Sequence, residues 1–492
     1  MEQSAPRAKL RDAFDDFFFK RSTGRAEACF RVGYASVLFI EQLGLSKKLE
    51  LLFSNAGVHP GTPLDFLYPV WLVKGLFWLW VSAALLLGLG VRTRVAAVSN
   101  LVLCIYFFGL RGFAAPHAAD WLLHSSAFYL ALMSSDARLS VDRRFGWASD
   151  LPRSVWALRL AQINWVSVYF TAGLAKLADE AWTTGHAFLD TLRHPLLTHF
   201  YPTFAVRVPG LMKAFDWLII AWELAFPILI ATRRLRALAL LSALVFNVAI
   251  FLTLRIGMFT VLASVGLLLF LDDAPLKKVT LPGEGATLVQ PGHLAPGRWV
   301  KAFVLAHTSL LMVVSVGHVL LGLRATRLGR VLAGLPIVSY YTRGIAGFAY
   351  YDVWNSQFFF KPVRLIYYEA TSPDGEPAPI EPFDAGGAFD PGLRYYTEER
   401  EGLLSIRLAS TPIPLGAWRG YIRYLVDKYR SGHAWPCPTQ IRIYRIAAEL
   451  DRFGSEPTRL GVPKQPLVQA TLRCAGREID MVLSAAPAVH QP

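Results

Sequence analysis

Long apolar runs are the feature that most constrains what this chain can fold into. Nine stretches rich in Leu, Ala, Val and Phe have about the 17–25 residues that a helix needs to cross a hydrocarbon layer. They lie near residues 26–45, 66–90, 95–113, 118–134, 155–177, 212–231, 235–254, 256–272 and 300–323. The sequence therefore predicts a multi-pass α-helical membrane bundle of about nine spans.

Composition and charge support a membrane location over other classes. Hydrophobic residues make up 54% of the chain and charged residues only 17%, whereas soluble domains carry roughly 25% charged residues. The formal charge of +14 raises nucleic acid as a partner, but the basic residues lie mainly in short connections between apolar runs, where Lys and Arg set topology. We therefore expect the lipid bilayer, and no nucleic acid, as the partner.

The same pattern predicts three parts. Residues 1–25 form an amphipathic segment on the cytoplasmic side, residues 26–323 the membrane domain, and residues 324–492 a β-rich soluble domain. Strand-like segments at 358–368 and 440–445 and a helix near 417–430 support the last assignment. With the positive side inside and an odd number of spans, this domain is extracytoplasmic. Cys437 and Cys474 could form one disulfide there.

One lysine stands at the end of an otherwise apolar run. Lys176 closes the fifth run, 155–177, and an ammonium in or near hydrocarbon costs roughly 2.5 kcal/mol or more. Such a side chain reaches back to the interface, pairs with an acid, or gives up its proton and serves as a base. The local sequence leaves all three fates open.

Four other ionisable residues are embedded in the runs and predict a polar interior shared between helices. They are Arg31, Glu41, His124 and Glu223. We expect Arg31 and Glu41 to be structural charges, with Arg31 paired to an acid, while Glu223 serves as a buried acid or as the partner of a cation. His124 could be a core histidine, a haem or metal ligand, or a proton carrier, and a lone histidine in an apolar run is usually the first of these.

Other chemistry lacks support. The sequence holds no Walker A loop, Gly-x-Gly-x-x-Gly, His-Glu-x-x-His or Gly-x-Ser-x-Gly motif. His307 and His318 stand eleven residues apart in the ninth run, and their role stays open. With no clustered His, Cys or carboxylate ligands in the runs, no metal is predicted.

A set of short motifs recurs in a recognisable order. They are Phe30-Arg31 with Glu41, Leu87-Gly-Leu-Gly-Val-Arg92, His124-Ser125, Met133 through Ser140-Val-Asp142, Val168 through Lys176-Leu177 with Trp182 and Gly185, Arg193-His194, and Ile256-Gly-Met-Phe259. Over about residues 25–275 this order resembles vitamin K-dependent gamma-glutamyl carboxylase and the bacterial HTTM proteins related to it. The segment from Trp354 to Pro362 also resembles the motif that often follows this membrane region.

The resemblance implies a lumenal active site and a chemistry. In the carboxylase a lysine deprotonates reduced vitamin K, oxygen turns it into a strong base, and that base removes a glutamate γ proton before carbon dioxide adds. The matching residues imply Lys176 as catalytic base, His124 beside the reacting quinone, and Arg193, Asn247 and Glu223 around the quinol or substrate. The implied cofactors are a vitamin K or menaquinol-type quinol, O2 and CO2, with a peptide or protein substrate docked by the C-terminal domain.

Two departures and one relative leave the function open. The carboxylase has two adjacent lysines where this chain has Ala175-Lys176, and a histidine where Asn247 stands, which argues against glutamate carboxylation in particular. A quinol-oxidising or epoxidising enzyme of the bacterial inner membrane is the first interpretation. The second is a non-enzymatic HTTM component of antimicrobial-peptide or toxin maturation or export, whose buried charges clamp helices together.

Overall fold

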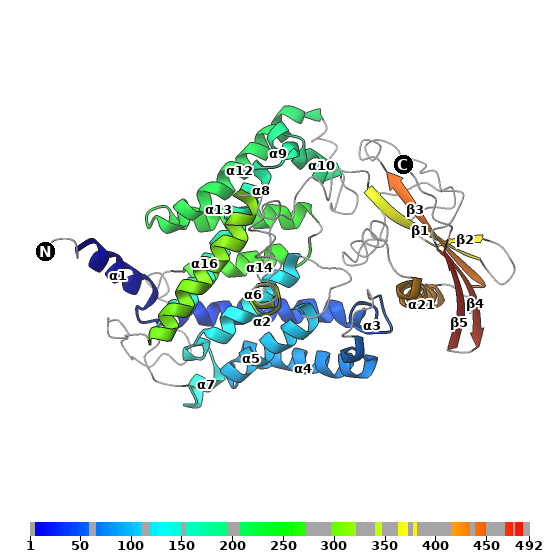
Figure 1. The fold of residues 1–492 in the computed structure, drawn as a ribbon, viewed down its shortest axis with the longest axis horizontal. Coiled ribbons are helices and arrows are strands. Elements are labelled where there is room, and N and C mark those ends of the chain that lie inside the picture. Colours follow the sequence, from blue (N-terminus) through cyan, green and yellow to red (C-terminus); the bar gives the residue numbers. More distant parts are fainter. Residues whose placement is uncertain are drawn as a thin grey trace.

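The computed structural model shows a helical part and a sheet part at opposite ends of an elongated molecule (Figure 1). It describes residues 5–58, 65–109, 118–148, 154–193, 207–254, 256–271, 297–320, 340–346, 363–371, 377–380, 415–432, 438–448, 468–475 and 478–485. The statements below concern these residues. Cys437 and the segment from Trp354 to Pro362 lie outside them.

The predicted apolar runs are found as helices. Their bounds are α2 Arg25–Ser46, α4 Val70–Leu89, α5 Thr93–Cys104, α6 Ala118–Leu132, α8 Trp156–Leu177, α12 Pro209–Ala231, α13 Arg236–Thr253, α14 Phe259–Gly266 and α16 Arg298–Leu320. Shorter helical pieces connect or flank them: α1 Ala5–Phe18, α3 Leu49–Phe53, η1 Asp65–Leu67, η2 Ile105–Gly109, η3 Ser135–Ala137, α7 Val141–Arg144, α9 Glu180–Thr184, α10 Ala187–Arg193, η4 Leu267–Phe270 and η5 Tyr340–Ile345.

The predicted number of spans is not supported. Within the described ranges, four helices are long and apolar enough to cross a membrane, namely α2, α4, α12 and α13. Helix α5 ends after 12 residues and α14 after 8. Helix α8 has the length, but polar residues such as Gln162, Asn164 and Lys176 lower its hydropathy. The molecule is thus a protein with membrane-compatible apolar helices, whereas the sides on which its ends lie remain predictions.

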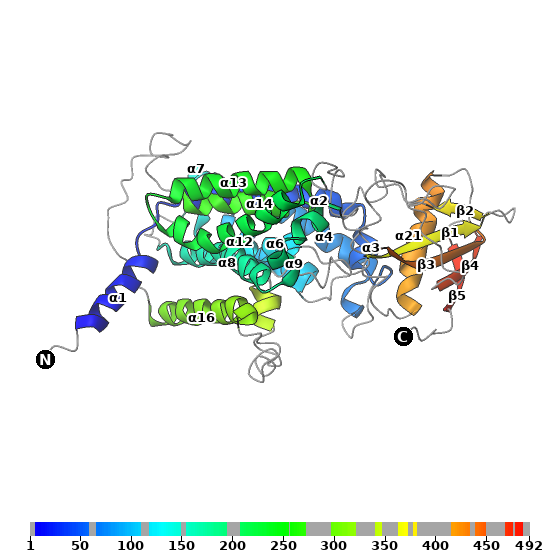
Figure 2. The same ribbon diagram turned by 90° about the horizontal axis from the view of Figure 1, so that it is seen from above.

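The C-terminal part contains a sheet covered by one helix. The strands β1 Val363–Thr371, β2 Pro377–Ile380, β3 Gln440–Ala448, β4 Val468–Ala475 and β5 Glu478–Ala485 are antiparallel in the order β2-β1-β3-β4-β5. Helix α21, Leu415–Gly432, lies beside the sheet (Figure 2). The predicted helix and the predicted strand pattern are therefore present, and the domain boundaries at 25 and 323 stay predictions.

Buried apolar side chains on α21 and on β3 explain how the helix covers the sheet. Trp418, Ile422 and Leu425 recur every three to four residues and are buried, as expected for the apolar stripe of an amphipathic helix. Ile441 and Ile443 on β3 alternate with polar neighbours and are fully buried. These side chains belong to one apolar core with the helical bundle.

Asp142 joins the start of α5 to the turn around α7. Its carboxylate accepts hydrogen bonds from the backbone N–H of Arg92 at 2.8 Å, and from the backbone N–H and hydroxyl of Thr93 at 2.7 Å each. Burial alone would raise the pKa of Asp142, but the hydrogen bonds from Thr93 and Arg92 outweigh it and hold this pKa below its ordinary value.

This contact predicts an acid-sensitive contribution to stability. Because the pKa of Asp142 is lower in the folded chain, its contribution is present above the unfolded pKa of about 3.9 and is lost as the pH falls through the lower folded pKa. Asp142→Ala is expected to lower the melting temperature at pH 7, and this difference shrinks as the pH falls through the lowered folded pKa of Asp142. Thermal unfolding of both proteins between pH 2.5 and 7 measures it. A pH-independent difference would contradict the assignment.

Candidate functional site

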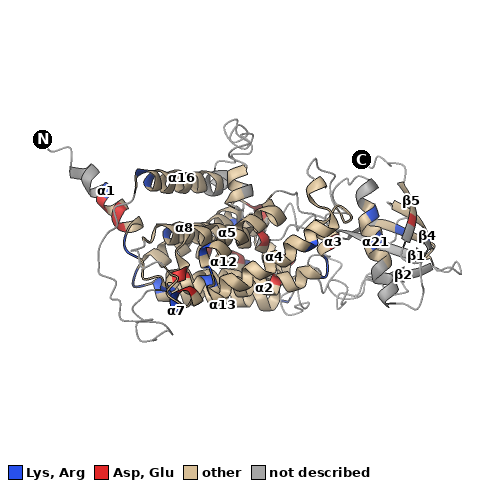
Figure 3. Cartoon of the chain, turned by 90° about the horizontal axis from the view of Figure 1, so that it is seen from below, with Lys and Arg blue, Asp and Glu red and all other residues tan. Residues whose placement is uncertain are grey.

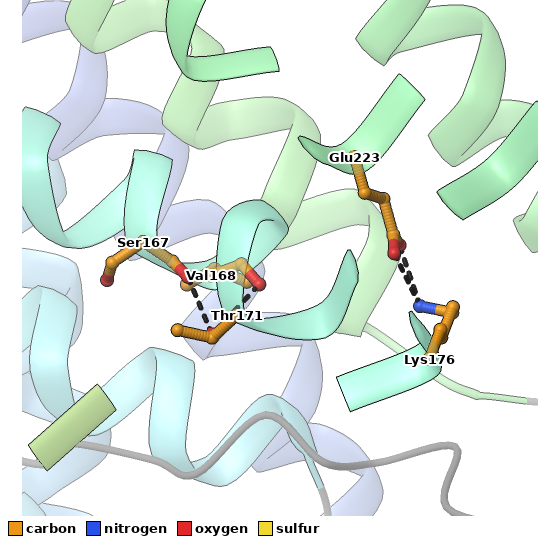
Figure 4. Close-up of polar contacts among 5 residues, drawn as sticks. All are labelled: Ser167, Val168, Thr171, Lys176 and Glu223. Carbon is orange, nitrogen blue, oxygen red and sulfur yellow. Dashed lines mark hydrogen bonds and ion pairs between the residues drawn. The ribbon is translucent and has the colours of Figure 1, made fainter. Parts of the chain in front are cut away.

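Lys176 is held in a buried ion pair. Its ammonium, in the last turn of α8, donates to both carboxylate oxygens of Glu223 on α12, with Nζ–Oε1 and Nζ–Oε2 distances of 2.8 and 2.7 Å (Figure 4). The two side chains are 6% and 4% exposed. Of the three fates open to Lys176, the structure shows pairing with an acid, and it shows Glu223 as the partner of a cation.

Local sequence explains how the two helices come close enough. Gly173, three residues before Lys176, faces α12, and a Cβ placed there would lie 2.9 Å from Cβ of Glu223. Small residues let helix backbones approach closely. The hydroxyl of Thr171, by contrast, donates within α8 to the carbonyl of Ser167 at 2.6 Å, so it takes no part in the pair (Figure 4).

An aromatic ring covers the ammonium. Nζ of Lys176 lies 5.1 Å from the ring centroid of Trp182, within the range of cation–π attraction. Trp182 belongs to the short helix α9, whose start is capped by Asp179: its Oδ1 accepts from the backbone N–H of Ala181 at 2.9 Å. This turn after α8 holds the ring over the cation.

The ion pair opens into a largely apolar cavity of about 460 Å³. Helix α8 lines it with a stripe of side chains at helical spacing: Trp165, Val168, Tyr169, Ala172 and Lys176. Side chains of α12, α13 and α14 form most of the remaining wall. The volume falls in the range of small-molecule sites, about 300–1,000 Å³, and the charged end gives a lipophilic ligand one polar anchor.

Two neutral polar pairs also face this cavity. Asn247 donates from Nδ2 to the hydroxyl of Tyr169 at 3.0 Å, and Trp222 donates from its indole N–H to the hydroxyl of Ser242 at 3.0 Å. The family resemblance placed Asn247 at the site, but the sequence analysis did not predict Tyr169, Trp222 or Ser242 there. A signal existed, because Tyr169 stands seven residues, or about two helical turns, before Lys176 on the same face.

His124 does not join this cavity. It is fully buried on α6, yet the residue of α6 that lines the cavity is Leu122. Two positions along a helix turn the side chain by about 200°, so Leu122 and His124 point in opposite directions. His124 is therefore not among the residues that line this cavity, and its place beside a reacting quinone stays a prediction. Arg193 ends α10, and its side chain lies outside the described residues.

Arg31 is held by backbone carbonyl oxygens, and the carboxylates of Asp136 and Asp142 also act on it electrostatically. Its fully buried guanidinium donates to the backbone carbonyls of Ser135 and Leu139, and to that of Arg138 at 3.4 Å. Glu41, half-buried on the same helix, stands about 15 Å further along the axis. Arg31 thus fastens α2 to the turn after α6, with carbonyl oxygens as its hydrogen-bond partners and Asp136 and Asp142 as the nearby acids.

His307 takes part in a buried Tyr–His–Tyr chain away from the cavity. Its Nε2 lies 3.1 Å from the hydroxyl of Tyr129, and its Nδ1 lies 2.7 Å from that of Tyr341. The imidazole also stacks on Phe128 at 5.5 Å between ring centroids. These contacts connect α16 to α6 and η5. The side chain of His318, the other histidine of the ninth apolar run, lies outside the described residues.

The family model of the HTTM domain matches residues 26–274, just over half of the chain. The chain belongs to the HTTM family. This domain occurs in vitamin K-dependent carboxylase-like membrane proteins. Comparisons with curated proteins and with solved structures give no significant match.

The match locates the site within the family domain. The HTTM domain of this chain contains α8, α12 and α13, and therefore Lys176, Glu223 and Asn247. It ends just after η4 at Phe270, so α16 and the sheet lie beyond it. No group of three or more His, Cys, Asp or Glu side chains that would hold a metal is found among the described residues.

Proposed function

We propose that the chain is an integral membrane enzyme that binds a reduced quinol of the vitamin K or menaquinol type in the cavity beside Lys176 and Glu223. The buried ion pair at the end of an apolar cavity is the observation that carries this proposal. By analogy with the carboxylase that the chain resembles, the proposed enzyme converts the quinol to a quinone or an epoxide. This oxidation is coupled to modification of a peptide or another substrate.

The walls of the cavity suit a ligand that arrives from lipid. Phe215 and Leu218 on α12 and Val245 on α13 line the cavity and are also 38%, 60% and 61% exposed. Both helices are candidate spans, so in a bilayer these exposed side chains meet acyl chains. A lipophilic quinol with a long hydrocarbon tail can therefore enter the cavity from the bilayer, between α12 and α13, without passing through water.

The ion pair supplies both acid–base functions that a quinol needs. When bound, the quinol supplies the reducing equivalents, with O2 as the oxidant. The carboxylate of Glu223 accepts the hydroxyl proton of the ligand, and the ammonium of Lys176 stabilises the oxygen left negative. The proton therefore stays within the pair. Lys176 thus acts as cation and proton donor within a unit in which Glu223 is the first acceptor.

Asn247 narrows the chemistry. An amide does not gain or lose a proton at ordinary pH, and here it is bonded to Tyr169. Asn247 therefore cannot support a reaction that needs an imidazole at this position. We therefore propose quinol oxidation or epoxidation as the activity, and leave carbon dioxide addition to glutamate as the less supported coupled reaction.

The test measures turnover of a defined quinol. Wild-type protein in nanodiscs is supplied with chemically reduced menaquinone and O2, and quinone and epoxide are quantified by mass spectrometry. Removing a general acid–base group typically costs about 100-fold or more, so Lys176→Ala and Glu223→Gln are both expected to lose at least that. Ala172→Trp is expected to fill the cavity and prevent quinol retention while leaving the pair intact.

A matched control is available in a second ion pair. Lys301 donates to Asp15 at 2.6 and 2.7 Å outside the cavity, and these side chains are 30% and 29% exposed. Lys301→Ala removes the same kind of group and is expected to keep full turnover. Equal turnover by wild type and Lys176→Ala, or no turnover by wild type, would rule out the enzyme.

A second candidate function rests on the same pair. A bidentate contact that joins α8 to α12 is also what a helix clamp requires, and it favours a non-enzymatic component of peptide maturation or export. Lys176→Arg separates the two proposals. Arginine keeps the charge and the pairing but does not release a proton, so a clamp keeps its function in this variant and the proposed acid–base unit loses it.

A further inference from the structure

A second cavity, of about 470 Å³, lies where the sheet part meets the helical bundle. It is bounded by the end of α2, by α3, by the first turns of α4 and by α21. The lining residues are Ser46, Lys47, Lys48, Leu49, Glu50, Leu51, Ala56, Gly57, Lys74, Phe77, Trp78, Gly420, Arg423 and Tyr424. We call it the basic cleft.

The two parts of the molecule are in direct contact beside this cleft. A Cβ placed on Gly420 of α21 would lie 2.3 Å from the carbonyl oxygen of Gly57, so only glycine lets α21 rest against the turn that follows α3. This contact makes Arg423 and Tyr424, one turn further along α21, a wall of the cleft. The cleft is therefore built from both parts of the chain.

The charge of the basic cleft is strongly positive. Four cationic side chains line it, Lys47, Lys48, Lys74 and Arg423, against one carboxylate, that of Glu50. Glu50 forms an ion pair with Lys74. Lys and Arg positions, in blue, occur both beside α3 and on α21 (Figure 3). Such a lining favours a ligand with at least one full negative charge.

The place of the cleft in the bundle indicates which anion. Helices α2 and α4 are candidate spans, and the cleft lies at the end of one and the beginning of the other. Trp78, one turn after Lys74, is 58% exposed, and Trp71 is 73% exposed. Trp71 is the second residue of α4, and exposed tryptophans at the ends of spanning helices mark the headgroup level of a membrane.

An apolar path leads from the cleft along α4. Trp78, Leu85 and Leu89 recur at helical spacing below Lys74, and all three are exposed. Acyl chains can lie against this stripe while a headgroup reaches the lysines.

We propose that the basic cleft binds the phosphate headgroup of an anionic phospholipid whose acyl chains lie along the exposed face of α4. Lys47, Lys74 and Arg423 bind the phosphate oxygens, and Trp78 packs against the glycerol region. Because Arg423 belongs to α21, the bound lipid fastens the sheet part to the membrane surface. This assignment is independent of the chemistry proposed for the cavity beside Lys176.

The experiment titrates the full-length protein with defined lipids. Protein stripped of lipid in mild detergent is mixed with dioleoylphosphatidylglycerol or dioleoylphosphatidylcholine, and binding is measured by native mass spectrometry. The wild type is expected to prefer the anionic lipid. Since a basic residue near a membrane surface contributes about fivefold to anionic-lipid affinity, each of Lys47→Gln, Lys74→Gln and Arg423→Gln should weaken it by about that factor, and the triple variant further.

The control removes equal charge elsewhere. Arg144→Gln/Arg233→Gln/Arg234→Gln deletes three exposed arginines outside the cleft and is expected to keep wild-type preference. All three cleft positions are exposed, so the single variants remain informative even if the triple variant folds poorly. Equal binding of the two lipids by the wild type, equal losses in cleft and control variants, or displacement of the anionic lipid by inorganic phosphate or an acidic peptide would each overturn the proposal.

Discussion

Breaking the Lys176–Glu223 pair from one side is expected to lower the free energy of unfolding by about 3–5 kcal/mol, because the remaining charge stays buried without its partner. The structure supports the upper part of this range, since both side chains are at most 6% exposed and the ammonium contacts both carboxylate oxygens. Thermal and denaturant unfolding of Glu223→Ala and Lys176→Met in detergent measures the loss.

Removing both charges together should restore stability. Lys176→Met/Glu223→Leu fills the same space with apolar side chains, and such replacements are often neutral or stabilising. The half-exposed Lys301–Asp15 pair provides the matched control: Lys301→Ala is expected to cost less than about 1 kcal/mol. If the double variant is as unstable as Glu223→Ala, the pair stabilises the fold by something other than mutual charge compensation.

The double variant also separates fold from function. A stable Lys176→Met/Glu223→Leu protein that has lost quinol turnover would assign the pair to catalysis, because structure alone no longer explains the loss. Full biological function in the same variant would instead identify the pair as a helix clamp. Stability and turnover therefore have to be measured on the same preparations.

Gly266→Ala is expected to be the most damaging single-methyl change in the bundle. A Cβ on Gly266 of α14 would lie 1.7 Å from Cε2 and 2.0 Å from Nε1 of Trp165 on α8. That indole is fully enclosed, packs edge-on to Phe30 at 5.7 Å, and donates to the carbonyl of Ala263 at 3.2 Å. Its contacts with Phe30 and with the carbonyl of Ala263 oppose a shift of the ring.

Overpacking of this kind costs about 1–3 kcal/mol, and the lost indole hydrogen bond adds about 1 kcal/mol. Trp165 also lines the cavity beside Lys176, so quinol retention should fall with stability. Gly44→Ala, in the last turn of α2, is the control, because a Cβ there meets nothing within 4 Å, and its melting temperature should stay close to that of the wild type. Equal melting temperatures for the two variants would contradict the close approach.

Much of the secondary structure was predictable. Helices cross apolar environments only if every backbone group is bonded within the segment, so long apolar runs such as those at 212–231 and 235–254 correspond to α12 and α13 with ends within a few residues. The same reasoning overestimated the spans. It treated every apolar run as crossing, although runs such as 256–272 break into a short helix and a 3₁₀ turn.

The candidate site, like the fold, was predictable only in part. A charged residue within an apolar run is easily recognised in a sequence. Lys176 and Glu223 were therefore both predicted as site residues. Their pairing was not, because the residues are 47 positions apart and the contact depends on how α8 and α12 pack. The same packing placed His124 out of the cavity and brought Tyr169 to Asn247.

Patterns along the sequence predict apolar helices that carry a few charged residues, followed by strands. Hydrophobic periodicity and desolvation cost act residue by residue, and both can be read along the chain. The pairing of the charges follows from how the helices pack, because it depends on helix rotation and on close approaches such as that at Gly173. Two positions along a helix turn a side chain by about 200°, which is why Leu122 of α6 lines the cavity and His124 does not.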